Sequence, residues 1–221
     1  MNANGMNLAY QLMMGVSLAA CAGFRAWLPM LALGIMARSG HVMLHPSFQF
    51  LASDGVMIIF GLAAALEFLG DKFIVIDHFL DAAGTIARPV AGTIIASSML
   101  TKMDPSTALL MGLIVGGGTS LTVHAGKALA RAKVSLLAPF HGGAGNAVVS
   151  LGEDFVSTAM LGLVWLSPAL ACLFAALLVG LAVVLIYIGF KTGQKIFAFL
   201  FHREEYIQPP PAQIVQWAQT P

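Results

Sequence analysis

The sequence predicts an all-α membrane protein, a bundle of about six transmembrane helices arranged as two pseudo-symmetric, inverted halves. The first observation behind this prediction is composition, because 58% of the 221 residues are hydrophobic and only 10% are charged. Soluble domains are roughly 45–50% apolar and about 25% charged. The second observation is a series of apolar runs near the length of a membrane span, about 20 residues. The third is a set of short motifs that recur in the two halves of the chain.

Six segments are long and apolar enough to cross a bilayer as helices. They cover residues 7–36, 55–78, 84–101, 106–130, 145–166 and 168–190. The first is about half again as long as a bilayer requires, and its run CAGFRAWLP contains Gly23, Arg25 and Pro29. We therefore expect a kinked or broken helix there. The last segment carries no charged residue and is the clearest span.

The predicted spans define one transmembrane domain over residues 1–202, with halves at about 7–103 and 104–192. A Pro-rich cytoplasmic tail is expected over residues 203–221. Six crossings place both termini on one side of the membrane. That side would hold eight Lys and Arg residues (Lys72, Arg88, Lys127, Arg131, Lys133, Lys191, Lys195 and Arg203) against Arg38 and Lys102 on the other. Because cytoplasmic loops carry the excess of basic residues, we predict that both termini are cytoplasmic.

An internal repeat is suggested by two pairs of segments. ALEFLGDKF (65–73) and AVVSLGEDF (147–155) share Ala, Leu-Gly, an acid and Phe at the same places. ARPVAGTIIA (87–96) and SPALACLFAA (167–176) each place Pro at the start of an apolar span. An odd number of spans per repeat inverts the second copy, which brings equivalent segments together near the middle of the bilayer. The matches are short, so the inverted repeat is a hypothesis.

Several titratable residues fall inside or beside the apolar spans and follow helical stripes. An Asp at the centre of a transmembrane helix costs about 2.5–3.5 kcal/mol, so partner groups are expected. Residues three, four and seven apart lie on one helix face. This spacing predicts three polar faces that turn towards one another: Glu67, Asp71, His78, Asp81, Thr85 and Arg88; Ser120, His124, Lys127 and Arg131; and Asn146, Ser150, Glu153 and Ser157, with Asp154 beside it.

The polar faces give a candidate ion site with two sets of residues. The ion-binding residues would be the four acids Glu67, Asp71, Glu153 and Asp154. The charge partners or proton relay would be Arg25, Lys72, His124 and Lys127. Carboxylate oxygens suit Ca²⁺, Mg²⁺ or Mn²⁺, and ionisable groups inside membranes usually mark ion or proton pathways.

Two other interpretations remain open for these charges. The near balance of acids and bases also fits an ion-pair network that fixes helix register and carries nothing. Asp77, His78 and Asp81 also fit an amphipathic segment at the cytoplasmic surface, where their charges would be solvated.

Enzymatic chemistry is not predicted. No Ser/His/Asp or Cys/His constellation is evident, and the glycine-rich runs VGGGTS and HGGAGN lack the pattern of a Walker or Rossmann loop. We therefore expect no enzymatic activity and no cofactor. The net charge of +1 gives no basic footprint for nucleic acid.

Three blocks carry a family resemblance: AGFRAWLP, LEFLGDKFIVIDHFLDAAGTIARPVAGT and GNAVVSLGEDF, in this order. They resemble the bacterial membrane proteins grouped as domain-of-unknown-function family 4126 (DUF4126). The resemblance implies a multi-pass protein of the bacterial cytoplasmic (inner) membrane and implies no activity. A looser likeness is to the Gdt1-type cation/proton exchangers, whose inverted three-span halves each carry an E-x-G-D-K/R-S/T motif. Glu67, Gly70, Asp71 and Lys72 would correspond, with one extra residue in the spacing and Phe73 in place of the hydroxyl residue.

The functional expectation is a small secondary transporter of a cation, with or without proton coupling, through a carboxylate-lined site between inverted halves. The alternative is a non-catalytic accessory or assembly subunit of a larger membrane complex. Expected partners are the lipid bilayer and an inorganic cation or proton. A homo-oligomer or a larger membrane complex is compatible with either function.

Overall fold

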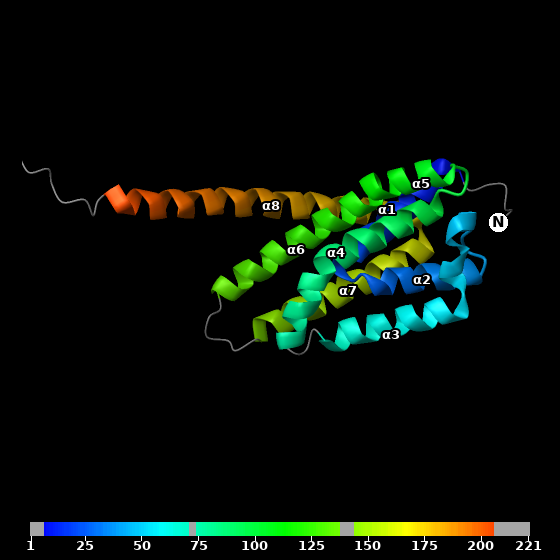
Figure 1. Cartoon of the computed structure of the whole chain (residues 1–221), viewed down its shortest axis with the longest axis horizontal. Helices are drawn as coiled ribbons and strands as arrows, with labels where there is room; N and C mark the ends of the chain where they lie inside the picture. The colour runs from blue at the N-terminus through cyan, green and yellow to red at the C-terminus, as the bar shows by residue number, and fades with distance from the viewer. Residues whose placement is uncertain (1–6, 71–73, 138–143, 206–221) are drawn as a thin grey trace, which may run out of the picture. The chain divides into compact units, whose positions relative to one another are not determined.

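A computed structural model describes residues 7–70, 74–137 and 144–205, and all its regular elements are helices (Figure 1). The prediction of an all-α protein is confirmed for this part of the chain. The elements in order are α1 (Leu8–Phe24), α2 (Trp27–Arg38), the 3₁₀ helix η1 (Pro46–Ala52), α3 (Asp54–Gly70), α4 (Ile74–Met99), α5 (Pro105–Met111), the π-helical turn η2 (Gly112–Gly117), α6 (Gly118–Leu137), α7 (Ala144–Leu166) and α8 (Pro168–Glu205).

Three of the described helical stretches are long and apolar enough to cross a membrane: Pro105–Ala132, Val148–Leu166 and Pro168–Lys195. The bent pair of η1 and α3, which meet at an angle of 62°, counts as a fourth if it forms one span. The chain is thus a membrane protein by its apolar helices. The prediction of six spans in two inverted halves goes beyond these three or four stretches.

The first predicted span, residues 7–36, is two helices that run in opposite directions (Figure 1). The predicted break is present, because α1 ends at Phe24 and α2 begins at Trp27. One pocket is lined both by Tyr10, near the start of α1, and by Met36, near the end of α2. The prediction of a single crossing here is wrong. The predicted orientation of the termini depended on that crossing and stays a prediction.

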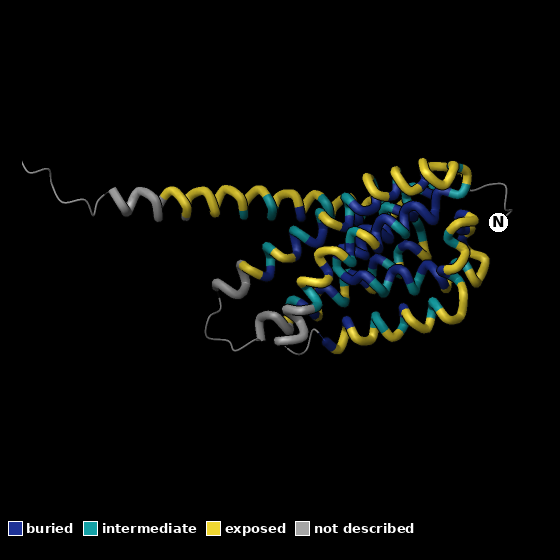
Figure 2. The backbone as a smooth tube through the Cα atoms, viewed as in Figure 1, coloured by how far each residue is buried: buried dark blue, intermediate teal, exposed yellow. Residues whose placement is uncertain are grey.

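Helix α1 forms the centre of the bundle and packs against α4, α6 and α7. Figure 2 shows buried residues concentrated on α1 and on the faces of its neighbours. Small residues allow this packing: a Cβ on Gly15 would lie only 3.3 Å from the Cα of Ala96 in α4, and membrane helices approach closely through such positions. Arg25 directly follows the last residue of α1 and, because α1 is central, lies buried in the interior of the bundle.

Helix α4 differs from its prediction at its start. The spans predicted at 55–78 and 84–101 left residues 79–83 as a loop, but α4 runs without interruption from Ile74 to Met99. Helix α3 ends earlier, at Gly70. Glu67 and Asp81 consequently lie on two separate helices, so the single polar face predicted from Glu67 to Arg88 is wrong.

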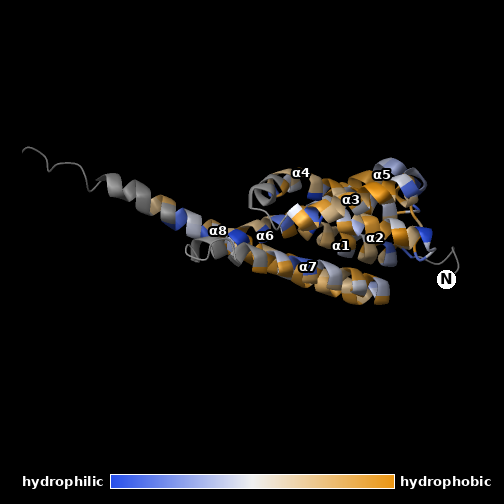
Figure 3. Ribbon diagram, turned by 90° about the horizontal axis from the view of Figure 1, so that it is seen from below, coloured by the Kyte–Doolittle hydropathy of each residue, from blue (hydrophilic) through white to orange (hydrophobic). Residues whose placement is uncertain are grey.

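Helix α7 agrees closely with the span predicted at 145–166, and α8 begins where the span predicted at 168–190 begins. Pro168 starts α8, a position where its missing N–H costs no helical hydrogen bond. Helix α8 continues to Glu205, so residues 203–205 of the predicted tail are helical, and residues 206–221 lie outside the described residues. Large apolar side chains on α7, including Phe155 and Leu166, are exposed, as expected of a surface in contact with lipid. Figure 3 shows hydrophobic residues along the length of α7.

Candidate functional site

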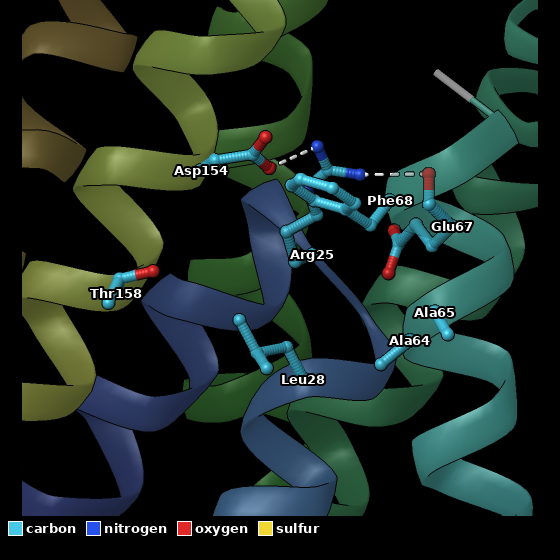
Figure 4. Close-up of a pocket in the computed structure, with 8 residues that line it drawn as sticks. All are labelled: Arg25, Leu28, Ala64, Ala65, Glu67, Phe68, Asp154 and Thr158. Atoms are coloured by element: carbon cyan, nitrogen blue, oxygen red, sulfur yellow. Dashed lines mark hydrogen bonds and ion pairs between the residues drawn. The ribbon is translucent and has the colours of Figure 1, made fainter. Parts of the chain in front are cut away.

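The site begins at Arg25, in the break between α1 and α2. Its backbone is extended, and its N–H donates to the carbonyl of Cys21 at 3.0 Å. The side chain is only 3% exposed. Its guanidinium donates to the carboxylate of Asp154 in α7 and, at 3.1 Å, to the backbone carbonyl of Glu67 in α3 (Figure 4). Arg25 thus connects three segments that are far apart in the sequence.

Glu67 lies near the end of α3 and faces the start of α2. Its two carboxylate oxygens accept from the backbone N–H groups of Ala26 at 3.2 Å and Trp27 at 3.5 Å. The first N–H groups of a helix lack partners inside the helix and favour an anion. The guanidinium of Arg88 lies 3.7 Å from Glu67 Oε1. Glu67 is therefore held by helix-start amides as well as by a base.

Glu153 of α7 is held by two bases from α6. Arg131 donates to both of its carboxylate oxygens, at 2.9 and 3.0 Å, and Lys127 Nζ lies 2.9 Å from Oε2. Two-pronged Arg–carboxylate contacts are among the strongest ion pairs in proteins. The same two bases also reach Asp81 of α4, Arg131 at 2.9 Å and Lys127 at 3.6 Å. Asp81 thereby joins α4 to the α6–α7 pairing.

Arg88 connects these two groups of charges. Its guanidinium lies 3.3 Å from Asp81 and 2.6 Å from Nδ1 of His124. A guanidinium can only donate hydrogen bonds, so Nδ1 accepts and the imidazole is neutral. The remaining ring nitrogen, Nε2, then carries the proton and lies 3.3 Å from the hydroxyl of Thr85. His124 is therefore a neutral member of the network.

The acids and bases together form one balanced network. Four acids meet four bases: Glu67, Asp81, Glu153 and Asp154 against Arg25, Arg88, Lys127 and Arg131. Each of these acids contacts at least one of the bases. No group of three or more His, Cys, Asp or Glu side chains within the described residues could hold a metal ion. Among these residues the charges pair with one another.

The structure brings together six of the eight predicted site residues: Arg25, Glu67, His124, Lys127, Glu153 and Asp154. The other two, Asp71 and Lys72, lie outside the described residues. Three members were not assigned to the site from the sequence, namely Asp81, Arg88 and Arg131. The bases Arg88 and Arg131 were counted as cytoplasmic, but they are only 1% and 7% exposed. The signal that could have assigned these three residues to the site was their position on the predicted helical stripes.

A cavity of about 310 Å³ adjoins one end of the network (Figure 4). Its lining comes from the α1–α2 break, α2, α3 and α7: Arg25, Leu28, Ala64, Ala65, Glu67, Phe68, Asp154 and Thr158. Phe68 and Thr158 are exposed, so the cavity is reachable from the protein surface. A ligand that entered would meet the ion pair of Arg25 and Asp154 within a mainly apolar wall.

The comparisons with known proteins identify a family and no individual relative. No curated protein and no solved structure matches the chain. Residues 12–187 match the family described as "Domain of unknown function (DUF4126)". The matched range contains every described residue of the charged network and of the cavity. The chain therefore belongs to the DUF4126 family.

Proposed function

We propose that this protein is a secondary transporter of the inner membrane, and that it moves a cation in a cycle coupled to proton binding by the buried carboxylates. The observation that carries the proposal is the cavity of about 310 Å³ lined by Arg25, Glu67 and Asp154. These three residues come from separate segments and continue into the balanced network. Ionisable groups inside membrane proteins usually mark ion or proton pathways.

The energetic cost of the network supports a role beyond packing. Taking an ion pair out of water costs more than well-packed apolar side chains of similar volume would, in many proteins by about 1–4 kcal/mol. This chain contains only 21 Lys, Arg, Asp and Glu residues, and eight of them meet in one network. Burying so many charges in one place costs more free energy than apolar packing would if the network only held the helices together.

The pairing of the acids favours protons as the coupling ion. A metal ion needs several oxygen ligands at once, whereas each of the four carboxylates in the network is already engaged by at least one base. A proton needs a single oxygen and converts the carboxylate to a neutral group. Protonation of Asp154 at the cavity would weaken its pairing with Arg25. The freed charge of Arg25 would then alter what the cavity binds.

A flux measurement in liposomes tests the proposal. Purified protein is reconstituted with an internal pH-sensitive dye, and gradients of protons, Na⁺, K⁺, Ca²⁺ and Mn²⁺ are applied in turn. We expect the wild type to couple proton movement to at least one cation gradient, and Asp154→Asn to abolish this flux. Asp54→Asn is the matched control, because the Asp54 side chain is 74% exposed and pairs only at the surface with Arg38.

Two results would count against transport. The first is a folded, monodisperse wild type that moves neither protons nor any cation tested. The second is a flux that Asp154→Asn and Asp54→Asn leave equally intact. Copurification at fixed stoichiometry with a larger membrane complex, together with absent flux, would favour an accessory subunit instead.

A further inference from the structure

Helices α5 and α6 form one continuous apolar stretch, Pro105–Ala132, that contains an irregular turn. Residues Gly112–Gly117 adopt π-helical geometry between the two α-helical parts. A π-helical turn has hydrogen bonds from residue i to i+5 and so holds about one residue more than an α-helical turn. Such turns are rare inside α-helices and often lie at functional sites.

The π-helical turn rests on α4 through glycines. A Cβ on Gly117 would lie 2.6 Å from Thr93 Oγ1, and one on Gly116 would collide with the backbone carbonyl of Gly92. On its other side the turn exposes the apolar side chains of Leu113 and Ile114. Two of the three large side chains of the turn therefore lie on its exposed side, and its glycines let the backbones of the turn and α4 approach closely.

The turn sets which face of α6 meets the charged network. After the turn, α6 carries one stripe of four residues that each contact α4 or α7, namely Ser120, His124, Lys127 and Arg131. We infer that conversion of the π-helical turn to α-helix rotates this stripe as one unit, by about 100° with a rise of about 1.5 Å, the values for one residue of α-helix.

Rotation would replace the bases by uncharged residues. Each position on the stripe would be taken by the preceding residue, and these residues are Thr119, Val123, Gly126 and Ala130. Asp81 and Glu153 would then lose Lys127 and Arg131, which is costly for buried carboxylates unless they are neutral. Proton binding to these acids would permit the rotation. This coupling rests on the proposed function.

A single-residue deletion and a single-residue insertion test the inference. Removing Ile114 from the turn leaves the right number of residues for regular α-helix and preserves the contacts of the stripe that follows. Inserting one Ala after Leu121, which is also exposed but follows the turn, rotates His124, Lys127 and Arg131 out of the network, and conversion of the turn to α-helix would rotate them further in the same sense. We expect the Ile114 deletion to unfold at nearly the wild-type temperature in detergent and the insertion after Leu121 to unfold at a clearly lower one.

Flux in the same liposome assay tests the movement separately. With the turn fixed as α-helix, the Ile114 deletion should remain folded and lose proton-coupled flux. Equal losses of unfolding temperature in the Ile114 deletion and the insertion after Leu121 would overturn the role of the turn in setting the register of α6. A folded Ile114 deletion with wild-type flux would overturn the rotation. A folded wild type without flux would contradict the proposed function. The two unfolding temperatures would still test whether the turn sets the register of α6 against the charged network.

Discussion

Removing the guanidinium of Arg131 should destabilise the protein more than removing an exposed guanidinium. Arg131 is 7% exposed, donates to both oxygens of Glu153 at 2.9 and 3.0 Å and lies 2.9 Å from Asp81. Arg131→Met removes these contacts while keeping much of the side-chain volume. Breaking a buried ion pair from one side typically costs about 3–5 kcal/mol. Lys127 still contacts Glu153 at 2.9 Å, so we expect about 3 kcal/mol.

The matched control is Arg38→Met. Arg38 pairs with Asp54 at the surface, where both side chains are more than half exposed. Exposed pairs contribute about 0–1 kcal/mol. The free energy of unfolding of each variant is measured by denaturant titration in detergent micelles. Equal losses for Arg131→Met and Arg38→Met would refute the conclusion that Arg131 belongs to a buried network.

A paired replacement separates charge from packing. In Arg131→Met/Glu153→Met, neither buried charge is left facing an apolar partner, and Lys127 retains Asp81 at 3.6 Å. Replacing a whole buried ion pair by apolar residues is often neutral or stabilising. The double variant should therefore be more stable than Arg131→Met alone. A further loss in the double variant would show that Arg131 acts through packing and not through its charge.

Two further predictions concern single positions. A Cβ on Gly84 would lie 2.8 Å from Cζ of Arg88, so Gly84→Ala should lower the free energy of unfolding by about 1–3 kcal/mol. Gly152 has open space at its Cβ, so Gly152→Ala should stabilise helix α7 by up to about 1 kcal/mol. Denaturant titration measures the free energy of unfolding of both variants, and equal effects would contradict the packing of Arg88. Asp104 caps α5, and the hydroxyl of Ser106, 2.5 Å away, lowers the pKa of its carboxyl below the usual range. Its stabilising effect is therefore present above the unfolded pKa of about 3.9 and is lost as pH falls through the lower folded pKa. Unfolding measured across acidic pH should show this loss in the wild type and not in Asp104→Asn; identical profiles would contradict the cap.

The helical content and much of the site follow from periodicity. The stripe from Ser120 to Arg131 was visible at spacings of three and four residues, and its bases do face the acids of α4 and α7. Glu153 was expected to turn inward for the same reason, since a carboxylate in hydrocarbon needs a partner. Local spacing therefore predicts which residues share a face.

The sequence did not predict how the faces come together. A break at Arg25 is visible from Gly23 and Pro29, but composition does not tell whether the chain then continues across the membrane or turns back. The structure turns it back, with α1 packed against α4 and α2 packed against α3. The π-helical turn was also missed, since a glycine run is equally typical of close helix packing.

Counting basic residues by loop misplaced part of the network. The method assumes that Lys and Arg near the predicted ends of spans lie in water. The boundary of α4 was predicted about ten residues too late, so Arg88 was assigned to the cytoplasmic side. The resulting orientation relied on a base that pairs instead with Glu67 and Asp81.

The coupling energy between Arg25 and Asp154 tests the central claim most directly. These residues are 129 positions apart, and they meet only if the α1–α2 break brings Arg25 to α7 inside the bundle. A double-mutant cycle uses Arg25→Met, Asp154→Asn and the double variant, with the free energy of unfolding as readout. We predict a favourable coupling of at least about 1.5 kcal/mol, as measured for close charge pairs. Additivity within about 0.5 kcal/mol, as for distant and independent sites, would contradict the account.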